Sequence, residues 1–174
     1  DAMEVDFAGT DPAVSGPMNA PMSVTASGVF TALKTIVDPD GLAPPNSGCW
    51  RTIKVTAPKG CVLNAEFPSP VVYANHEISH RVCDMTFGAV APFWPDNVMA
   101  CSQGTSAVIT FGGKDPRNGQ RYVSYETIKG GFGARPVKDG INAIASGISN
   151  TMNTPIEILE MSFPVRVDEY ALRP

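Results

Sequence analysis

The stretch with the most recognisable chemistry is NHEISHRVCD, residues 75–84. It contains His76, Glu77 and His80 in the H-E-x-x-H spacing. On a helix this spacing directs two imidazoles at one Zn²⁺, with the glutamate as general base for amide hydrolysis. If the helix continues, Cys83 falls on the same face and offers a thiolate as third ligand. The chain has only these two histidines, so any further protein ligand is a carboxylate or a thiol.

Ordinary helix packing explains the same residues without a metal. Helical spacing predicts a helix over residues 77–90 with one apolar stripe, formed by Ile78, Val82, Met85 and Ala89. Cys83 and Phe87 then lie in a second packed face, and Glu77 with Arg81 makes an i, i+4 ion pair. The H-E-x-x-H pattern is short and no downstream histidine follows it. We therefore favour the packing interpretation and keep a zinc site at His76 and His80 as the alternative.

A second candidate for chemistry is YETIKGGFGARPVKDG, residues 125–140. Glycines and cations stand close together there: Lys129, Gly130, Gly131, Gly133 and Arg135. A glycine loop directly after a predicted strand can present backbone N–H groups to a phosphate or carboxylate. The alternative, which we favour, is a tight turn in which glycine allows positive φ or a close approach of two backbones.

Periodicity predicts the elements that must position these residues. Residues 3–7 alternate as an extended strand, and residues 19–37 have helical spacing with Asn19 or Ser23 as the cap. Residues 53–56 and 62–63 suggest a short hairpin, and residues 108–111 and 122–128 a hairpin with the long loop GGKDPRNGQ.

The last stretch, EILEMSFPVRVDEYAL, predicts an extended strand. Leu159, Met161 and Phe163 alternate there, and Pro164 suggests a bulge or edge position. Strands and helices thus alternate irregularly along the chain. This order favours an α+β or mixed α/β fold in one compact domain over a regular βαβ series.

Composition excludes several classes of partner. The net charge is −4, and the 13 basic residues are scattered along the 174-residue chain, which argues against nucleic acid or an anionic membrane. No apolar run has the length of a membrane span, and the first residues do not resemble a signal peptide. The four cysteines form no C-x-x-C pair, so we expect reduced thiols and a cytoplasmic location.

The order of the motifs resembles that of the hydantoinase B family. The resemblance spans nearly the whole chain and is carried by six blocks in order: VDFAGTDPAVSGPMNAP, PPNSGCWRTIKVTAPKGCVLNAEFPSPV, ANHEISHRVCDMTFGAV, ACSQGTSAVITFGG, YETIKGGFGARPVKDG and NTPIEILEMSFPVRVDEYALR. The family comprises B-type subunits of ATP-dependent N-methylhydantoinases, the matching half of 5-oxoprolinase, and related subunits of acetone and acetophenone carboxylases.

The resemblance implies an ATP-dependent cyclic-amide hydrolase or a ketone carboxylase. In such enzymes an A-type subunit or domain binds ATP, and the B-type part acts with it on a hydantoin, lactam or ketone. The family's acid- and histidine-rich blocks, associated with a divalent metal, precede the block that begins at VDFAGT. Residues 1–174 therefore resemble a C-terminal portion of a B-type subunit, with ATP and metal bound outside this chain and little activity expected from the chain alone.

The resemblance also bears on the opening motif. ANHEISHR matches a family segment of the form Gly-Asn-x-Glu-x-Ser-x-Arg, in which Asn75, Glu77 and Arg81 fit and His76 and His80 occupy variable positions. The resemblance thus makes the first three the candidate catalytic residues and the H-E-x-x-H match a coincidence. A structural module that supplies only an interface to the complex remains the other alternative.

Overall fold

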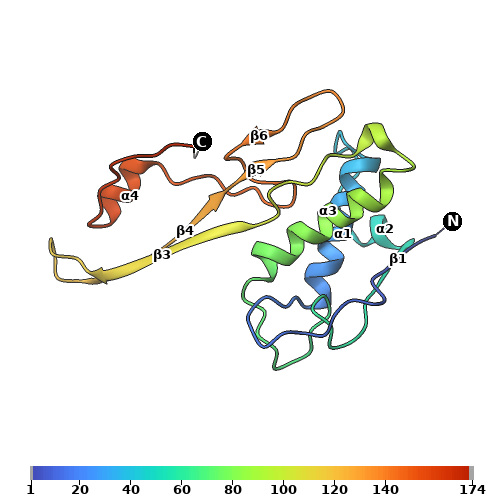
Figure 1. The fold of residues 1–174 in the computed structure, drawn as a ribbon, viewed down its shortest axis with the longest axis horizontal. Helices are drawn as coiled ribbons and strands as arrows, with labels where there is room; N and C mark the ends of the chain where they lie inside the picture. Colours follow the sequence, from blue (N-terminus) through green and yellow to red (C-terminus); the bar gives the residue numbers. More distant parts are fainter. Residues whose placement is uncertain (1, 173–174) are drawn as a thin grey trace.

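The computed structural model describes residues 2–172, and it confirms the predicted α+β class. The helices within residues 22–90 gather at one end of the molecule, and a long β-hairpin reaches away from them with the C-terminal helix beside its outer part (Figure 1). The elements in chain order are β1 (Met3–Asp6), α1 (Met22–Val37), α2 (Ser47–Trp50), β2 (Ile53–Thr56), a π-helical turn (Ala74–Ile78), α3 (Ser79–Val90), a 3-10 turn (Pro95–Asn97), β3 (Ser106–Lys114), β4 (Arg121–Lys129), β5 (Gly131–Phe132), β6 (Ile141–Asn142) and α4 (Ile156–Ser162).

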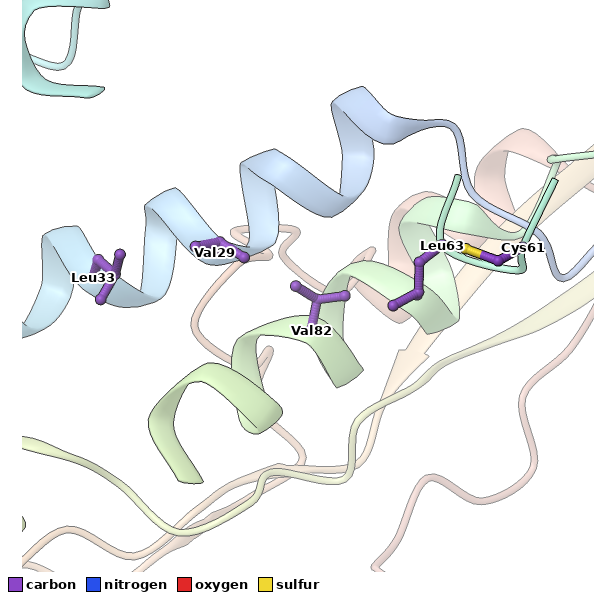
Figure 2. Close-up of a cluster of buried hydrophobic side chains, with 5 residues drawn as sticks. All are labelled: Val29, Leu33, Cys61, Leu63 and Val82. Atoms are coloured by element: carbon purple, nitrogen blue, oxygen red, sulfur yellow. The ribbon is translucent and has the colours of Figure 1, made fainter. Parts of the chain in front are cut away.

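The main core lies between α1 and α3. Figure 2 shows Val29 and Leu33 of α1 facing Val82 of α3, with Cys61 and Leu63 closing one end from the loop after β2. Burying each such aliphatic side chain contributes about 1.5–3 kcal/mol to the free energy of folding. The contact between these two helices is therefore the main apolar support of the molecule.

The opposite face of α3 is packed as well. Cys83 and Phe87 join Ala32 and Ile36 of α1 in a second buried cluster. The Cys83 thiol donates to the carbonyl oxygen of Gly28 (3.2 Å), and burial raises the pKa of this thiol to about 12. The predicted second packed face of this helix is confirmed.

Strands β1 and β2 form a small parallel sheet, with Met3 opposite Ile53 and Asp6 opposite Thr56. The predicted hairpin between residues 53–56 and 62–63 is therefore wrong, although the expected first strand is confirmed. The reason is that β2 takes its partner from the start of the chain. The residues after Gly60 instead bond to other loops, as where Val62 N–H donates to the Asp11 carbonyl (3.0 Å).

Strands β3 and β4 form the predicted antiparallel hairpin, longer than expected, with Ser106 opposite Lys129. Its turn is closed by Asp115, whose buried carboxylate accepts from Nη2 of Arg117 (2.8 Å). Gly119 allows the turn, because its φ is +75°. The hairpin leaves the helices at the Lys129 end, so this end is the one that contributes to a site beside α1 and α3 (Figure 1).

Two further expectations are corrected by the structure. Helix α1 begins after Pro21 without a side-chain cap, while the fully buried Asn19 uses its amide to bond the Val14, Gly16 and Pro70 carbonyls. The expected strand near the C-terminus is helix α4, which begins after Pro155 and ends before Phe163. Among residues 2–172 no helix is long and apolar enough to cross a membrane.

Candidate functional site

A pocket of about 410 Å³ opens where the hairpin leaves the helices. One wall comes from the start of α1 and the π-helical turn. The other comes from the first residue of β3, the last residues of β4 and residues 148–151. The polar residues that line it are Ser23, Ser27, Asn75, His76, Ser79, Ser106, Thr127, Lys129, Ser149 and Thr151. We call it the Lys129 pocket.

Lys129 is the cation of this pocket and is only 7% exposed. Its Nζ donates to Ser106 Oγ (2.9 Å) and to Ser149 Oγ (3.3 Å). Burial lowers the pKa of its ammonium group. Among residues 2–172 no carboxylate forms an ion pair with Lys129. An ammonium group has three N–H donors, so one donor and the whole positive charge remain for a ligand.

The buried His80 belongs to the same hydrogen-bond network as Lys129. Ser106 Oγ accepts from the ammonium, which can only donate, and also forms a hydrogen bond with Nε2 of His80 (3.2 Å). Nδ1 of His80 forms a second hydrogen bond, with Ser146 Oγ. Burial, and next the charge of Lys129, lower the pKa of His80, so the imidazole is neutral.

The other residues of the NHEISHR segment point to different places and do not form one site. His76 belongs to the π-helical turn, lines the pocket, and forms a hydrogen bond between its Nε2 and the Tyr125 hydroxyl (2.6 Å). Glu77 accepts from the Thr105 hydroxyl. Arg81 is exposed and packs on Gly104, where a Cβ atom would lie 2.7 Å from its Cζ. The structure thus brings Asn75 and His76 to the Lys129 pocket, whereas Glu77 and Arg81 brace α3 against residues 104–105.

The donors proposed for zinc do not converge on one point. Both ring nitrogens of His80 bond to serine hydroxyls, and the Cys83 thiol bonds to a backbone carbonyl. Within residues 2–172 no three His, Cys, Asp or Glu side chains come close enough to hold a metal ion. The π-helical turn explains the divergence, because it shifts His76 relative to the α-helical i, i+4 alignment with His80.

The glycines after Lys129 are packed against backbone and side chains. A Cβ atom at Gly133 would lie 1.8 Å from the Ala100 carbonyl oxygen, and one at Gly130 would lie 1.9 Å from the Gln103 side chain. Gly131 has φ of +152° in β5. Arg135 lines a different pocket and lies over the Phe132 ring at 5.5 Å. The predicted anion-binding set is therefore divided: Lys129 faces one pocket and Arg135 another.

Sequence reasoning missed the serines that surround Lys129. The predicted hairpin contained one usable signal, because the strand register that centres its turn on residues 115–120 places Ser106 opposite Lys129. Ser146 and Ser149 carry no such signal, since they reach the site from a loop. The assembled pocket offers one unpaired cation, hydroxyls, and the Asn75 amide. This set suits a ligand with a negatively charged carboxylate or phosphoryl group.

Comparison with known proteins gives the class of the whole chain. The family model for hydantoinase B/oxoprolinase matches residues 1–174, so the chain belongs to this family. An uncharacterised protein of Methanocaldococcus jannaschii is 39% identical over 171 residues, covering 98% of this chain and 29% of that protein. A putative B-type subunit of a D-/L-hydantoinase from a Pseudomonas strain is 35% identical over 176 residues, covering 98% and 29%.

Relatives named 5-oxoprolinase match the same region. A 5-oxoprolinase of Dictyostelium discoideum is 37% identical over 168 residues, covering 97% of this chain and 12% of that protein. The chain thus spans less than a third of the length of these relatives. The predicted resemblance to the hydantoinase B/5-oxoprolinase family is confirmed.

Proposed function

We propose that this chain is part of an ATP-dependent cyclic-amide hydrolase of the hydantoinase/5-oxoprolinase type. In this proposal the Lys129 pocket holds a negatively charged group of the substrate or of the species formed from it. The observation that carries the proposal is the buried Lys129 ammonium, which has a free donor and no carboxylate partner among the described residues. Support for the reaction type comes from the family and from relatives named as a hydantoinase and as 5-oxoprolinases.

Ring opening of a cyclic amide produces negatively charged groups that such a pocket can bind. In hydrolysis of a cyclic amide, the oxygen of water bonds to the acyl carbon and the C–N bond breaks. The acyl group becomes a carboxylate, and the released nitrogen takes up a proton. Activation by ATP also places a phosphoryl group on the substrate during the reaction. Both groups carry negative charge that a preorganised cation stabilises in a site that excludes water. In this account Lys129 meets the charge, and Asn75 and the serines orient the group through hydrogen bonds.

ATP and its divalent metal belong, in this proposal, to an A-type partner or to another region of the enzyme. None of the described acidic or histidine side chains gathers into a metal-binding group, and we assign this chain no residue for either. A ketone carboxylase would present similar phosphorylated and carboxylate species to the pocket. Turnover of a lactam or hydantoin without added bicarbonate supports the hydrolase, whereas bicarbonate-dependent turnover of a ketone supports the carboxylase.

The test is the exchange Lys129→Met in the assembled enzyme with its A-type partner and ATP. We expect ATP-dependent ring opening to fall by about 10²-fold, the usual cost of removing one group that stabilises developing charge. The matched control is Lys114→Met, since Lys114 lies in the same hairpin but is exposed near its turn.

Assembly has to be measured in the same samples by gel filtration. Full activity per assembled complex in Lys129→Met, with fewer complexes formed, would support the interface-module alternative and remove the proposed role of the pocket. Equal losses in Lys129→Met and Lys114→Met would show that general surface charge, and not this pocket, is responsible.

A further inference from the structure

A second and larger pocket, of about 790 Å³, lies along β1 and the end of α3. We call it the β1 groove. Its lining is mainly apolar and includes several large side chains that remain accessible, among them Met85 (46% exposed), Phe93 (77%) and Trp94 (45%). Contiguous exposed apolar surface is typical of places where a protein binds another protein segment, a membrane or a ligand.

The backbone of β1 forms one border of this groove. All residues from Met3 to Phe7 line it, and none of β2 does, so the groove lies on the side of β1 away from β2. The N–H groups of Met3 and Phe7 donate to Thr52 and Thr56 carbonyls of the β2 side (2.9 Å each). Because alternate residues of a strand bond to the same neighbour, the N–H groups of Glu4 and Asp6 point toward the groove.

The side chains of β1 leave this edge open to a neighbour. Glu4 pairs with Lys54 and Asp6 accepts from the Thr56 hydroxyl, so both carboxylates are held by β2. Among residues 2–172, β2 is the strand neighbour of β1. Parallel sheets in folded proteins are covered on both faces and are rarely limited to a pair of strands. An unpaired edge beside an apolar groove fits an extended segment with apolar side chains.

The length of the relatives indicates where such a segment comes from. The described chain corresponds to 29% of the Methanocaldococcus jannaschii relative and 29% of the Pseudomonas relative. Most of each relative therefore lies outside the region that this chain matches. The Lys129 pocket is formed by other residues, so the β1 groove is independent of the proposed function.

We infer that an extended apolar strand from the rest of the same B-type polypeptide pairs with β1 at its free edge and fills the β1 groove. Backbone hydrogen bonds to Glu4 and Asp6 fix the register of this strand. Its side chains cover Met85, Phe93 and Trp94.

The test is hydrogen–deuterium exchange of the β1 amides in the complete native polypeptide and in the 174-residue chain. We expect the Glu4 and Asp6 amides to exchange at least 10²-fold more slowly in the native polypeptide than in the shorter chain. The Val5 and Phe7 amides, which face β2, should be protected in both and serve as internal controls for an intact sheet.

A pair of variants separates the groove from the helix that lines it. Ala89→Glu places a charge in the groove at an exposed position, whereas Gly88→Glu adds the same charge beside it, where a Cβ atom has nothing within 4 Å. In the native polypeptide we expect Ala89→Glu to restore fast exchange at Glu4 and Asp6, and Gly88→Glu to leave exchange unchanged.

Several outcomes would overturn the inference. Fast exchange of Glu4 and Asp6 in the native polypeptide, with Val5 still protected, would show an open edge. Protection that grows with the concentration of the 174-residue chain would identify a second copy as the occupant. Protection that requires the A-type partner, or a native polypeptide with no further region, would exclude a strand from the same chain.

Discussion

Lys129 is the residue on which the functional account depends. A buried cation without a carboxylate partner lowers the stability of a folded protein, because its hydration is lost and is only partly replaced by neutral hydroxyls. The serines around Lys129 replace part of that hydration. If Lys129 is kept for function at the expense of stability, a variant that removes its charge should be more stable than the wild type.

We expect Lys129→Met to raise the free energy of unfolding of this chain by about 1 kcal/mol, since an apolar side chain of similar length replaces an unpaired ammonium. Lys114→Met should change it by less than about 0.5 kcal/mol, as for most exposed positions. Urea denaturation at pH 7 measures both. A Lys129→Met chain that is clearly less stable than the wild type would show that the lysine serves mainly to hold the fold together.

His80 predicts how stability depends on pH. Burial and the charge of Lys129 lower the pKa of His80 in the folded chain below its ordinary value of 6.5. The unfolded chain therefore takes up the proton first as the pH falls below about 6.5, and stability decreases from there down to the lowered folded pKa. Comparing pH 7 with pH 5 by urea denaturation, we expect a larger loss for the wild type than for His80→Gln. Equal losses would contradict a neutral buried imidazole.

Lys129 was predicted from the sequence to be an anion-binding candidate, but the residues predicted to bind the anion with it do not line its pocket. Glycines and Arg135 are its neighbours along the chain, yet Gly130 and Gly133 are used for close packing and Arg135 faces another pocket. Ser149 reaches the ammonium from a loop 20 residues further on. Such contacts depend on tertiary structure, which local spacing does not encode.

Among the secondary-structure elements, the crossing of α1 and α3 is the most constrained contact. A Cβ atom at Gly28 would lie 2.8 Å from Val82 Cγ1 and 3.1 Å from the Ser79 carbonyl oxygen. The absence of a side chain at Gly28 is what allows the two helices to approach at this point. Any larger residue has to push α3 away or distort Val82.

We expect Gly28→Val to lower the free energy of unfolding by about 1–3 kcal/mol, the usual cost of overpacking a core. The matched control is Gly88→Ala in α3, which meets nothing within 4 Å. It should be stabilising by up to about 1 kcal/mol through helix propensity alone. Thermal and urea denaturation of both variants check this, and a Gly28→Val chain as stable as the wild type would show that the crossing is not tight.

Most elements defined by contacts between residues close in sequence were predicted correctly, whereas the pairing of strands distant in sequence was not. Helices α1 and α3 and the β3–β4 hairpin were predicted because their periodicity and turn residues are local. The pairing of β1 with β2 joins residues about 50 apart, and nothing local reveals it. Helix α4 was mistaken for a strand because its apolar residues fit both periods, but Met161 of the presumed buried face is 74% exposed.

For the chain as a whole, the candidate site forms only when distant segments come together in the tertiary structure. The start of α1, the π-helical turn, the end of the hairpin and the loop at residues 148–151 each contribute to one pocket. Motif order along the full sequence was enough to predict the family, which the comparisons confirm. It was not enough to predict the pocket, because these four segments meet only when the hairpin docks beside the helix pair.

The central claim is that the Lys129 pocket binds an anionic group, and titration of lysine side chains by NMR tests it most directly. With ¹³C-labelled lysine and inorganic phosphate as the probe, the Lys129 resonance should shift saturably while that of Lys114 stays unchanged. The pKa of the Lys129 ammonium should start below its ordinary value of 10.5 and rise when phosphate is bound. If the chemical shift of Lys129 does not change on addition of phosphate, or changes by the same amount as those of all other lysines, the account is contradicted.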